Sequence, residues 1–405
     1  MKHFKVSRAL SWKALAALSA LLTCLGIASS AEAGKAKTFY SFKNDGIDGI
    51  NPEGTLVAGT NGFFLGTTAF GGSDGFGTVF KVNAKGVETV LHAFAGTGGG
   101  GDGYSPRSGL VPMGGGVFYG TTPGGGTFGY GTIYSITQAG AYSIVYSFTG
   151  DNDGSNPYSG LIKDKAGNVY GVTEYGGASG SQSAGFGTIY KIAAGGGQSV
   201  LYSFTGGDDG GHPLDVLVRD KAGNLYGVAR DFGHFHSGVV FKLSHTGVYS
   251  VLYAFTGGAD GGDPIGGLAL DSAGTTLYGT TNRGGGANLG TVFKIALGAT
   301  PVFTTLHSFG GGGDANLPTT ELVFDKAGDL FGTTGLGGEF DAGTVYKIAP
   351  DGTESVVYSF SPVNGHQDGP AAAVLVKGTL SSTVLYGTTD SGGTDDKGAV
   401  FRLKP

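Results

Sequence analysis

The chain has 405 residues, among them 83 glycines, 26 phenylalanines and 19 tyrosines, and its formal net charge is −6. An acidic chain without a basic stripe is excluded from the class of strong nucleic-acid binders. The many aromatic residues exclude a disordered chain in spite of the glycine content, so the glycines are expected to separate strands.

Residues 1–33 predict a cleaved export signal. Basic residues between Lys2 and Lys13 precede an almost wholly apolar stretch over residues 14–28, and small residues at Ala31 and Ala33 suit a signal peptidase. The apolar stretch is too short for a membrane-spanning helix. A lipid anchor at Cys24, the only cysteine, is the alternative, but the sequence before it is a poor match. We therefore expect a secreted or periplasmic protein, mature from residue 34, with no membrane span and no disulfide.

The phrase Leu-Tyr-Gly-Thr-Thr recurs seven times, with variants, along residues 34–405. Successive copies of its glycine are 54, 51, 56, 52, 53 and 55 residues apart. A narrow period in this range indicates a repeat array or a propeller. The seven copies place this glycine at Gly66, Gly120, Gly171, Gly227, Gly279, Gly332 and Gly387.

Each unit holds four short runs rich in β-branched and aromatic residues. In the third unit they lie at residues 160–162, 169–172, 187–192 and 199–204, bounded by Gly, Asp, Asn and Pro. Such runs predict strands, and no helical apolar period follows the signal segment. Four antiparallel strands per unit, repeated seven times, predict an all-β, seven-bladed β-propeller over residues 34–405.

The two ends of the chain predict that the propeller is a closed ring. The fourth run occurs in every unit except the seventh, which stops after its third run at residues 400–403. The missing run is present at the other end, as residues 39–42, before any complete unit begins. We expect this N-terminal strand to complete the last blade, since a linear array has no need of the offset.

A connection of the type Asp-Gly-x-x-Pro joins each unit to the next. The simpler interpretation is a turn in which each Asp accepts hydrogen bonds from its own backbone. The alternative is a ring of carboxylates that attracts cations to one mouth of the channel, although spaced single carboxylates hold a hard cation poorly. In a propeller these connections share a face with the Gly-rich loops between the second and third strands, so recognition is expected there. The aspartates are Asp48, Asp102, Asp153, Asp209, Asp260, Asp314 and Asp368.

The fourth unit departs most from the others. Polar residues stand before its first strand and after its second, and both loops should open on one face. Such a set could hold a transition metal or act as acid and base. An ordinary polar loop is the alternative, because no spacing matches a strong metal signature. The candidates are Asp209, His212, Arg230, Asp231, His234 and His236.

Aromatic residues mark a second difference between the units. Units one to three carry an aromatic ring at one loop position where later units have none, and three further tyrosines follow nearby in sequence. This sector is a candidate for stacking on sugar rings. The alternative is that the rings cap the edges of the blades. The candidate ligand-binding residues are Phe76, Tyr104, Tyr130, Tyr158, Tyr175 and Phe186.

The recurring phrases resemble the tandem repeat of the GloVer-containing proteins. Clear instances lie at residues 277–295, 330–348 and 200–204, and the resemblance covers nearly all of residues 34–405. It implies a bacterial exported protein, and many members carry a C-terminal surface anchor. This chain ends at Lys404-Pro405 without one, so a periplasmic or released protein is expected. The resemblance brings no activity and no binding residues with it.

Two functions from different classes stay open. The first is a non-enzymatic binding or scaffold protein, a monomer without a cofactor, whose partner is a polysaccharide or an extracytoplasmic protein. The second is a glycan hydrolase or lyase that uses the polar residues of the fourth unit. The sequence contains no Gly-x-Ser-x-Gly and no His-Glu-x-x-His, which favours the first. Quinone-cofactor propellers dock tryptophan between blades, and Trp12, the only tryptophan, lies in the export signal.

Overall fold

The computed structural model describes residues 35–96, 101–178, 184–363, 366–367, 376–377 and 384–405. The chain divides into two compact units, residues 1–33 and 34–405, and every described residue belongs to the second. The described residues form strands and turns but no helix, and hence no helix with the length and apolar character needed to cross a membrane. The expected export signal lies outside the described residues.

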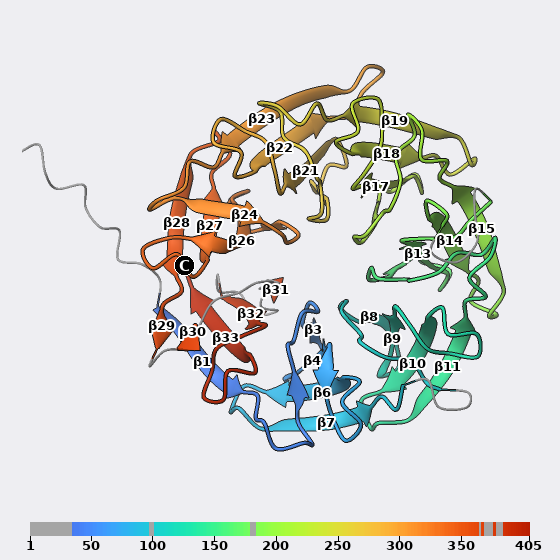
Figure 1. Cartoon of the computed structure of the whole chain (residues 1–405), viewed down its shortest axis with the longest axis vertical. Coiled ribbons are helices and arrows are strands. Elements are labelled where there is room, and N and C mark those ends of the chain that lie inside the picture. Colours follow the sequence, from blue (N-terminus) through green and yellow to red (C-terminus); the bar gives the residue numbers. More distant parts are fainter. Residues whose placement is uncertain (1–34, 97–100, 179–183, 364–365, 368–375, 378–383) are drawn as a thin grey trace, which may run out of the picture. The chain divides into compact units, whose positions relative to one another are not determined.

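Seven antiparallel sheets, six of four strands and one of five, stand around a common axis as the blades of a propeller (Figure 1). The expected all-β, seven-bladed fold is confirmed. From the axis outward, blade I contains β3 (Val57–Ala58), β4 (Phe63–Thr68), β6 (Thr78–Asn83) and β7 (Glu88–Ala93). Blade II contains β8 (Val111–Gly114), β9 (Val117–Thr122), β10 (Thr132–Thr137) and β11 (Tyr142–Ser147). Blade III contains β12 (Ile162–Lys163), β13 (Val169–Thr173), β14 (Thr188–Ile192) and β15 (Gln198–Ser203).

The remaining blades follow the same order. Blade IV contains β16 (Val218–Arg219), β17 (Leu225–Ala229), β18 (Val239–Leu243) and β19 (Tyr249–Ala254). Blade V contains β20 (Ala269–Leu270), β21 (Thr276–Thr281), β22 (Thr291–Ala296) and β23 (Val302–Ser308). Blade VI contains β25 (Val323–Phe324), β26 (Leu330–Gly337), β27 (Thr344–Ile348) and β28 (Glu354–Ser359), and β24 (Ala315–Pro318) also pairs with β26. Blade VII contains β31 (Val376–Lys377), β32 (Leu385–Thr389), β33 (Ala399–Lys404) and β1 (Lys35–Ser41).

The N-terminal strand closes the ring. β1 runs antiparallel to β33, from the pair Lys35 and Lys404 to the pair Ser41 and Ala399, and supplies the outermost strand of blade VII. Directly after β1, Phe42 is fully buried, with its ring centroid 5.0 Å from that of Phe80 in blade I. One short segment therefore completes the last blade and packs against the first. The closure expected from the chain ends is confirmed.

The glycine of the repeated phrase is explained by the residue opposite it. Gly227 of β17 pairs with Phe241 of β18, and a Cβ on Gly227 would lie 2.6 Å from Cζ of Phe241. The aromatic ring therefore occupies the place of the missing side chain, and the repeat needs glycine there for packing. The other such pairs are Gly66 with Phe80, Gly120 with Tyr134, Gly171 with Tyr190, Gly279 with Phe293 and Gly332 with Tyr346.

A buried pair of threonines links the second and third strands in five blades, as Thr68 and Thr78 do at 2.8 Å between their Oγ1 atoms. Blade IV has Ala229 opposite Val239 at this position, and both are fully buried. Exchanging both hydroxyl partners together leaves no unpaired polar atom, so the change costs little. The departure of the fourth unit thus extends into its core.

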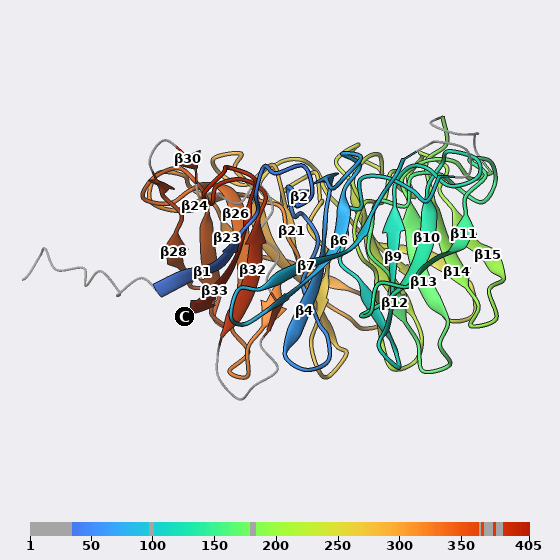
Figure 2. The same ribbon diagram turned by 90° about the horizontal axis from the view of Figure 1, so that it is seen from below.

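The two kinds of connection that were expected to share a face do so. Between blades, β2 (Gly49–Ile50) pairs with β5 (Phe70–Gly71), which directly follows β4. Equivalent bridges join Ser155 to Tyr175, Gly211 to Asp231 and Gly262 to Arg283. This face is the upper one in Figure 2, where β2 and β24 lie. The short hairpin of β29 (Pro362–Val363) and β30 (His366–Gln367) follows β28 on the same face.

Candidate functional site

A cavity of about 750 Å³ lies on the axis of the ring, because its lining comes from six successive blades. Its lining includes residues of the inter-blade connections and of the loops after the second strands, so it lies toward the face of these connections. Nine charged side chains line it, six carboxylates and three guanidinium groups. They are Glu53, Glu174, Asp215, Asp231, Asp263, Glu321, Arg107, Arg230 and Arg283.

Most of the lining comes from one position of the repeat. The three residues after the proline of each connection precede the innermost strand of the blade. They read Glu-Gly-Thr, Arg-Ser-Gly, Tyr-Ser-Gly, Leu-Asp-Val, Ile-Gly-Gly and Thr-Thr-Glu in units one to six. The rest of the lining follows the second strand, at Glu174, Arg230, Asp231 and Arg283, except Asp263, which directly precedes the proline of its connection. Near-identical blades thus present different side chains to one shared space.

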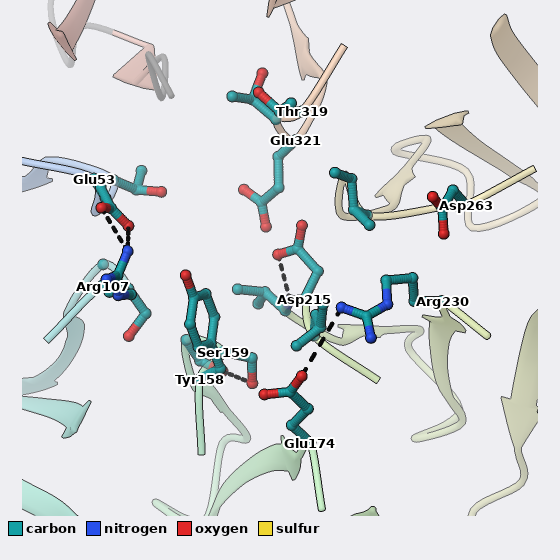
Figure 3. A pocket seen from close by; sticks show the side chains of 18 of the residues that line it. Glu53, Arg107, Tyr158, Ser159, Glu174, Asp215, Arg230, Asp263, Thr319 and Glu321 are labelled. Carbon is teal, nitrogen blue, oxygen red and sulfur yellow. Dashed lines mark hydrogen bonds and ion pairs between the residues drawn. The ribbon is translucent and has the colours of Figure 1, made fainter. Parts of the chain in front are cut away.

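Asp215 and Glu321 face one another across this space (Figure 3). A Cβ on Gly267 would lie 2.6 Å from Cγ of Glu321 and 3.2 Å from Cγ of Asp215, so the glycine leaves room for both. The amide of Val216 donates a hydrogen bond of 2.6 Å to Oδ1 of Asp215. Burial raises the pKa of both carboxyls, and the negative charge of Asp215 raises that of Glu321 further. The pair is arranged to hold a shared proton or a cationic group.

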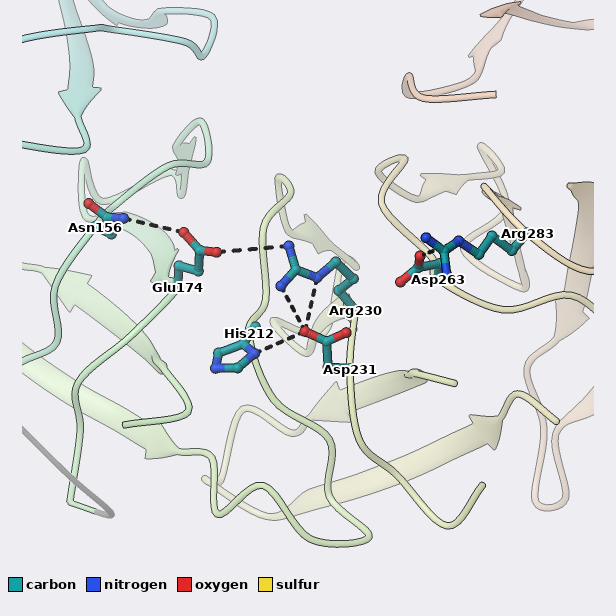
Figure 4. A network of polar contacts seen from close by, with 7 residues as sticks. All are labelled: Asn156, Glu174, His212, Arg230, Asp231, Asp263 and Arg283. Carbon is teal, nitrogen blue, oxygen red and sulfur yellow. Dashed lines mark hydrogen bonds and ion pairs between the residues drawn. The ribbon is translucent and has the colours of Figure 1, made fainter. Parts of the chain in front are cut away.

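A polar network lines another part of the cavity (Figure 4). Arg230 donates hydrogen bonds of 2.9 and 2.8 Å from Nε and Nη2 to Oδ2 of Asp231, and its Nη1 lies 3.9 Å from Oε1 of Glu174. Nδ1 of His212 lies 2.9 Å from the same Asp231 oxygen. Hydrogen bonds from His212 and then Arg230 lower the pKa of Asp231 to about 2. Asn156 donates to Glu174 at 3.3 Å and fixes the second carboxylate.

The other two arginines are also neutralised. Nη1 of Arg107 lies 2.7 Å from both carboxylate oxygens of Glu53, and Nε of Arg283 lies 3.1 Å from Oδ2 of Asp263. Among the described residues, no Lys, Arg or His forms an ion pair with Asp215 or Glu321. The uncompensated charge of the cavity is therefore negative and centred on this pair.

The structure separates the polar candidates of the fourth unit. Arg230 and Asp231 line the cavity, and His212 contacts Asp231 from behind. Asp209 accepts a backbone hydrogen bond from Thr205 and a hydroxyl bond from Tyr202, as a turn residue. His234 is 67% exposed and lies 3.5 Å from Asp208. Within the described residues, His234 and His236 are neither part of the cavity lining nor part of a three-ligand cluster.

The aromatic candidates are spread along the same face. Tyr158 alone lines the cavity, where the guanidinium carbon of Arg107 lies 5.6 Å from its ring centroid. Tyr175 packs against His212 at 5.1 Å between ring centroids. Tyr104 lies over Gly124 and 6.2 Å from the ring of Phe76. Three rings lie over glycines of the following connection, Phe76 over Gly96, Tyr130 over Gly150 and Phe186 over Gly206.

Sequence reasoning did not select most of the cavity residues, among them Asp215 and Glu321. A signal was present, because the three residues after the proline vary from unit to unit while the flanking phrases repeat. The loops after the second strands, where recognition is expected, contribute Glu174, Arg230, Asp231 and Arg283 to the lining.

The carboxyl pair predicts a dependence of stability on pH. The pKa values of both carboxyls are higher in the folded than in the unfolded chain. Below about pH 4 both groups are protonated in both states, and the pair contributes fully to the free energy of unfolding. This contribution is lost as the pH rises through the folded pKa values. We expect Glu321→Gln to be more stable than the wild type by about 1–3 kcal/mol at pH 8, with little difference at pH 4. Thermal unfolding at both pH values measures this. The exposed Glu339→Gln is the control, and an equal effect of both substitutions contradicts the prediction.

Comparisons with known proteins agree with the fold. A family model described as the Gloeobacter/Verrucomicrobia repeat matches residues 27–184 and 178–401. The extracellular domain of a protein assigned as a one-component system in B. thetaiotaomicron has a TM-score of 0.56 at 8% identity, over 90% of this chain and 39% of that one. A luciferin-regenerating enzyme has a TM-score of 0.46 at 12% identity, over 92% and 95% of the two chains. No curated protein matches the sequence.

Proposed function

Because the chain belongs to the family of the Gloeobacter/Verrucomicrobia repeat, whose repeats here build a whole propeller, we propose that it is an exported binding protein that holds a polar ligand in its axial cavity. The proposal includes removal of residues 1–33 as an export signal and a mature propeller of residues 34–405. The mass of the protein recovered from the periplasm or medium tests that part.

The observation that carries the proposal is the lack of symmetry in the cavity. Seven similar blades would give a ring of equal side chains if the axial positions served only packing. Instead, these positions differ from unit to unit. Glu53, Arg107 and Tyr158 directly follow the proline, Asp215 stands one residue later, and Glu321 two residues later. A cavity of a few hundred cubic ångströms with a few fixed polar groups is typical of a small-molecule site.

The chemistry of the lining favours a neutral or cationic polyhydroxy ligand, such as an oligosaccharide without acid groups. All three arginines already pair with carboxylates, so an anionic ligand would meet the uncompensated charge of Asp215 and Glu321. Carboxylates, serines and threonines in the lining suit sugar hydroxyls, and Tyr158 offers a ring face. A polysaccharide end or a short oligosaccharide is therefore the preferred ligand, and an extracytoplasmic protein is the alternative partner.

Binding to a panel of neutral, amino and uronic-acid oligosaccharides, measured by calorimetry, tests the proposal. We expect neutral or amino sugars to bind at least about ten-fold more tightly than acidic ones, a difference of about 1.4 kcal/mol. Tyr158→Ala and Asp215→Asn should each weaken binding by about ten-fold or more. The control is a double substitution of His234 and His236 by Ala, outside the cavity. Binding that is lost in the control and kept in the cavity variants contradicts the proposal.

A second function, hydrolysis of a glycan, is favoured by one specific observation. Asp215 and Glu321 form a carboxyl pair with raised pKa values, and such pairs act as general acid and base. In this alternative the catalytic groups are the carboxyl pair on the axis and not the histidines of the fourth unit. Release of reducing ends from a bound oligosaccharide, abolished in Asp215→Asn with binding retained, would support the enzyme. Binding without turnover in the wild type supports the binding protein.

A further inference from the structure

A trio of side chains recurs where neighbouring blades meet at the outer edge of the upper face. It consists of a Tyr or His near the end of an outermost strand, the Asp of the following connection, and a residue near the start of the next outermost strand. We call this the interblade trio. Six of them lie in the described residues, namely Tyr40–Asp48–Glu88, His92–Asp102–Tyr142, Tyr146–Asp153–Gln198, Tyr202–Asp209–Tyr249, Tyr253–Asp260–Phe303 and His307–Asp314–Glu354.

In each of the other five trios the Tyr or His hydrogen-bonds to the Asp, and in three of them its ring also stacks on the third residue. Tyr202 donates to Oδ2 of Asp209 at 2.8 Å and stacks on Tyr249 at 4.0 Å between centroids. In the trio that contains the other histidine, Nε2 of His92 lies 2.6 Å from Oδ2 of Asp102, and its ring stacks on Tyr142 at 3.9 Å. The usual content of an interblade trio is therefore one carboxylate, one partner that bonds to it and, in most cases, an aromatic ring.

Among the six, the trio of blades V and VI is the one that combines an imidazole with two carboxylates; the Tyr40–Asp48–Glu88 trio also has two carboxylates, but a phenol in place of the imidazole. His307, Asp314 and Glu354 offer one imidazole and two carboxylates, and one ligating atom of each lies within 4.8 Å of the others. Nε2 of His307 is 3.3 Å from Oδ2 of Asp314, longer than the hydrogen bond at His92. Two ligands at about 2.0–2.1 Å from a tetrahedral ion are about 3.3 Å apart. The separation thus suits an ion between these atoms.

Glu354 supplies an independent observation. Its Oε1 atom is buried from solvent and accepts no hydrogen bond; the same is true of Oε1 of Glu88, but the trio of Glu88 has no imidazole to act as a third ligand. Among the described residues, no Lys or Arg forms an ion pair with Asp314 or Glu354. The only ion-pair partner of these two carboxylates among the described residues is His307, which is charged only when protonated. Two neighbouring carboxylates, one with an unbonded buried oxygen, therefore leave a position that a cation would satisfy.

We propose that His307, Asp314 and Glu354 bind one divalent transition-metal ion of the zinc class, with water as the fourth ligand. One nitrogen and two carboxylate oxygens form a donor set that zinc accepts. Asp314 is held in place by backbone hydrogen bonds of 2.8 Å from Gly310 to Oδ2 and from Ala315 to Oδ1. The side chains of His307 and Asp314 are each 21% exposed, which gives an ion access. The ion would link β23 of blade V to β28 of blade VI, apart from the axial cavity.

Titration of the purified chain, without a histidine tag, with Zn²⁺ and Co²⁺ tests the proposal. We expect one equivalent of Zn²⁺ to bind by calorimetry, and Co²⁺ at the site to give the visible absorption of a tetrahedral complex. At about one hundred times the dissociation constant, Zn²⁺ should raise the melting temperature by about 3–6 °C. A chain that binds neither ion stoichiometrically overturns the proposal.

Side chains that occupy the equivalent positions in the other trios already fit between blades, so they are suitable substitutions at this site. His307→Tyr copies the arrangement of Tyr40, Asp48 and Glu88, and Glu354→Tyr copies that of His92, Asp102 and Tyr142. Each should fold with an unchanged circular dichroism spectrum and weaken Zn²⁺ binding by at least about 100-fold. His92→Tyr is the matched control and should keep the site. Full binding in His307→Tyr, or binding lost only when His234 and His236 become Ala, overturns the assignment.

Discussion

Deletion of residues 35–43 is expected to abolish the cooperative thermal transition of the propeller or to lower its melting temperature by more than about 10 °C. The deletion removes β1, leaves β33 as an unpaired edge in blade VII and removes the fully buried Phe42. Loss of a buried Phe side chain alone costs about 3–5 kcal/mol. An exposed apolar edge strand also promotes association between chains. Scanning calorimetry and light scattering of the deletion variant measure both effects.

Two controls separate strand pairing from core packing. Phe42→Ala keeps β1 and should remain a folded monomer with a lowered melting temperature. A permuted chain that begins at residue 44 and carries residues 35–43 after Pro405 restores the strand beside β33, because Lys35 pairs with Lys404. It should melt between the deletion variant and the wild type. A deletion variant that melts like the wild type would contradict closure by β1.

Gly227→Val is expected to destabilise the propeller by more than about 4 kcal/mol, as an overpacked and fully buried site. The new Cβ would lie 2.6 Å from Cζ of Phe241 and 2.8 Å from Cδ2 of Leu217, both of them core atoms. Neither can yield, because Phe241 and Leu217 belong to the core between blades III and IV. Chemical denaturation followed by tyrosine fluorescence gives the free energy of unfolding.

The cause is tested by making room for the new side chain. Phe241→Ala alone should cost about 3–5 kcal/mol, but combined with Gly227→Val it should cost clearly less than the sum of the two, because the substitutions act on one space. Gly195→Ala, in a turn where a Cβ would meet nothing within 4 Å, should change stability by less than about 0.5 kcal/mol. Additive costs of the core pair would rule out the packing explanation for the repeated glycine.

The repeat predicted the architecture because blades are local. Each blade pairs strands of a single repeat, and the one blade that takes a strand from elsewhere, where β1 pairs with β33, was visible as an offset of the last unit. The role of Gly227 was hidden, since its contact with Phe241 depends on the register between two strands. The repeat period and the turn residues can be read along the sequence, whereas strand register and side-chain direction depend on packing in the folded protein.

The candidate site was predicted only in part, for a physical reason. Arg230 and Asp231 were selected because they stand in the most divergent unit, and Tyr158 because it is aromatic. Asp215 and Glu321 come from the fourth and sixth units, and only the curvature of the ring brings them face to face. His307 and Glu354 likewise belong to different blades, and each alone is an unremarkable residue of an outer strand.

By itself, the sequence determined the strand content, the number of blades and the closure, because each follows from a pattern repeated at fixed spacing. It also marked the residues that differ between units. Only the tertiary structure decided which of these differing residues come into contact. The burial of Asp215 beside Glu321, and the gathering of His307, Asp314 and Glu354, arise between blades. Desolvation and charge act over a few ångströms in space, and no spacing along the chain encodes those distances.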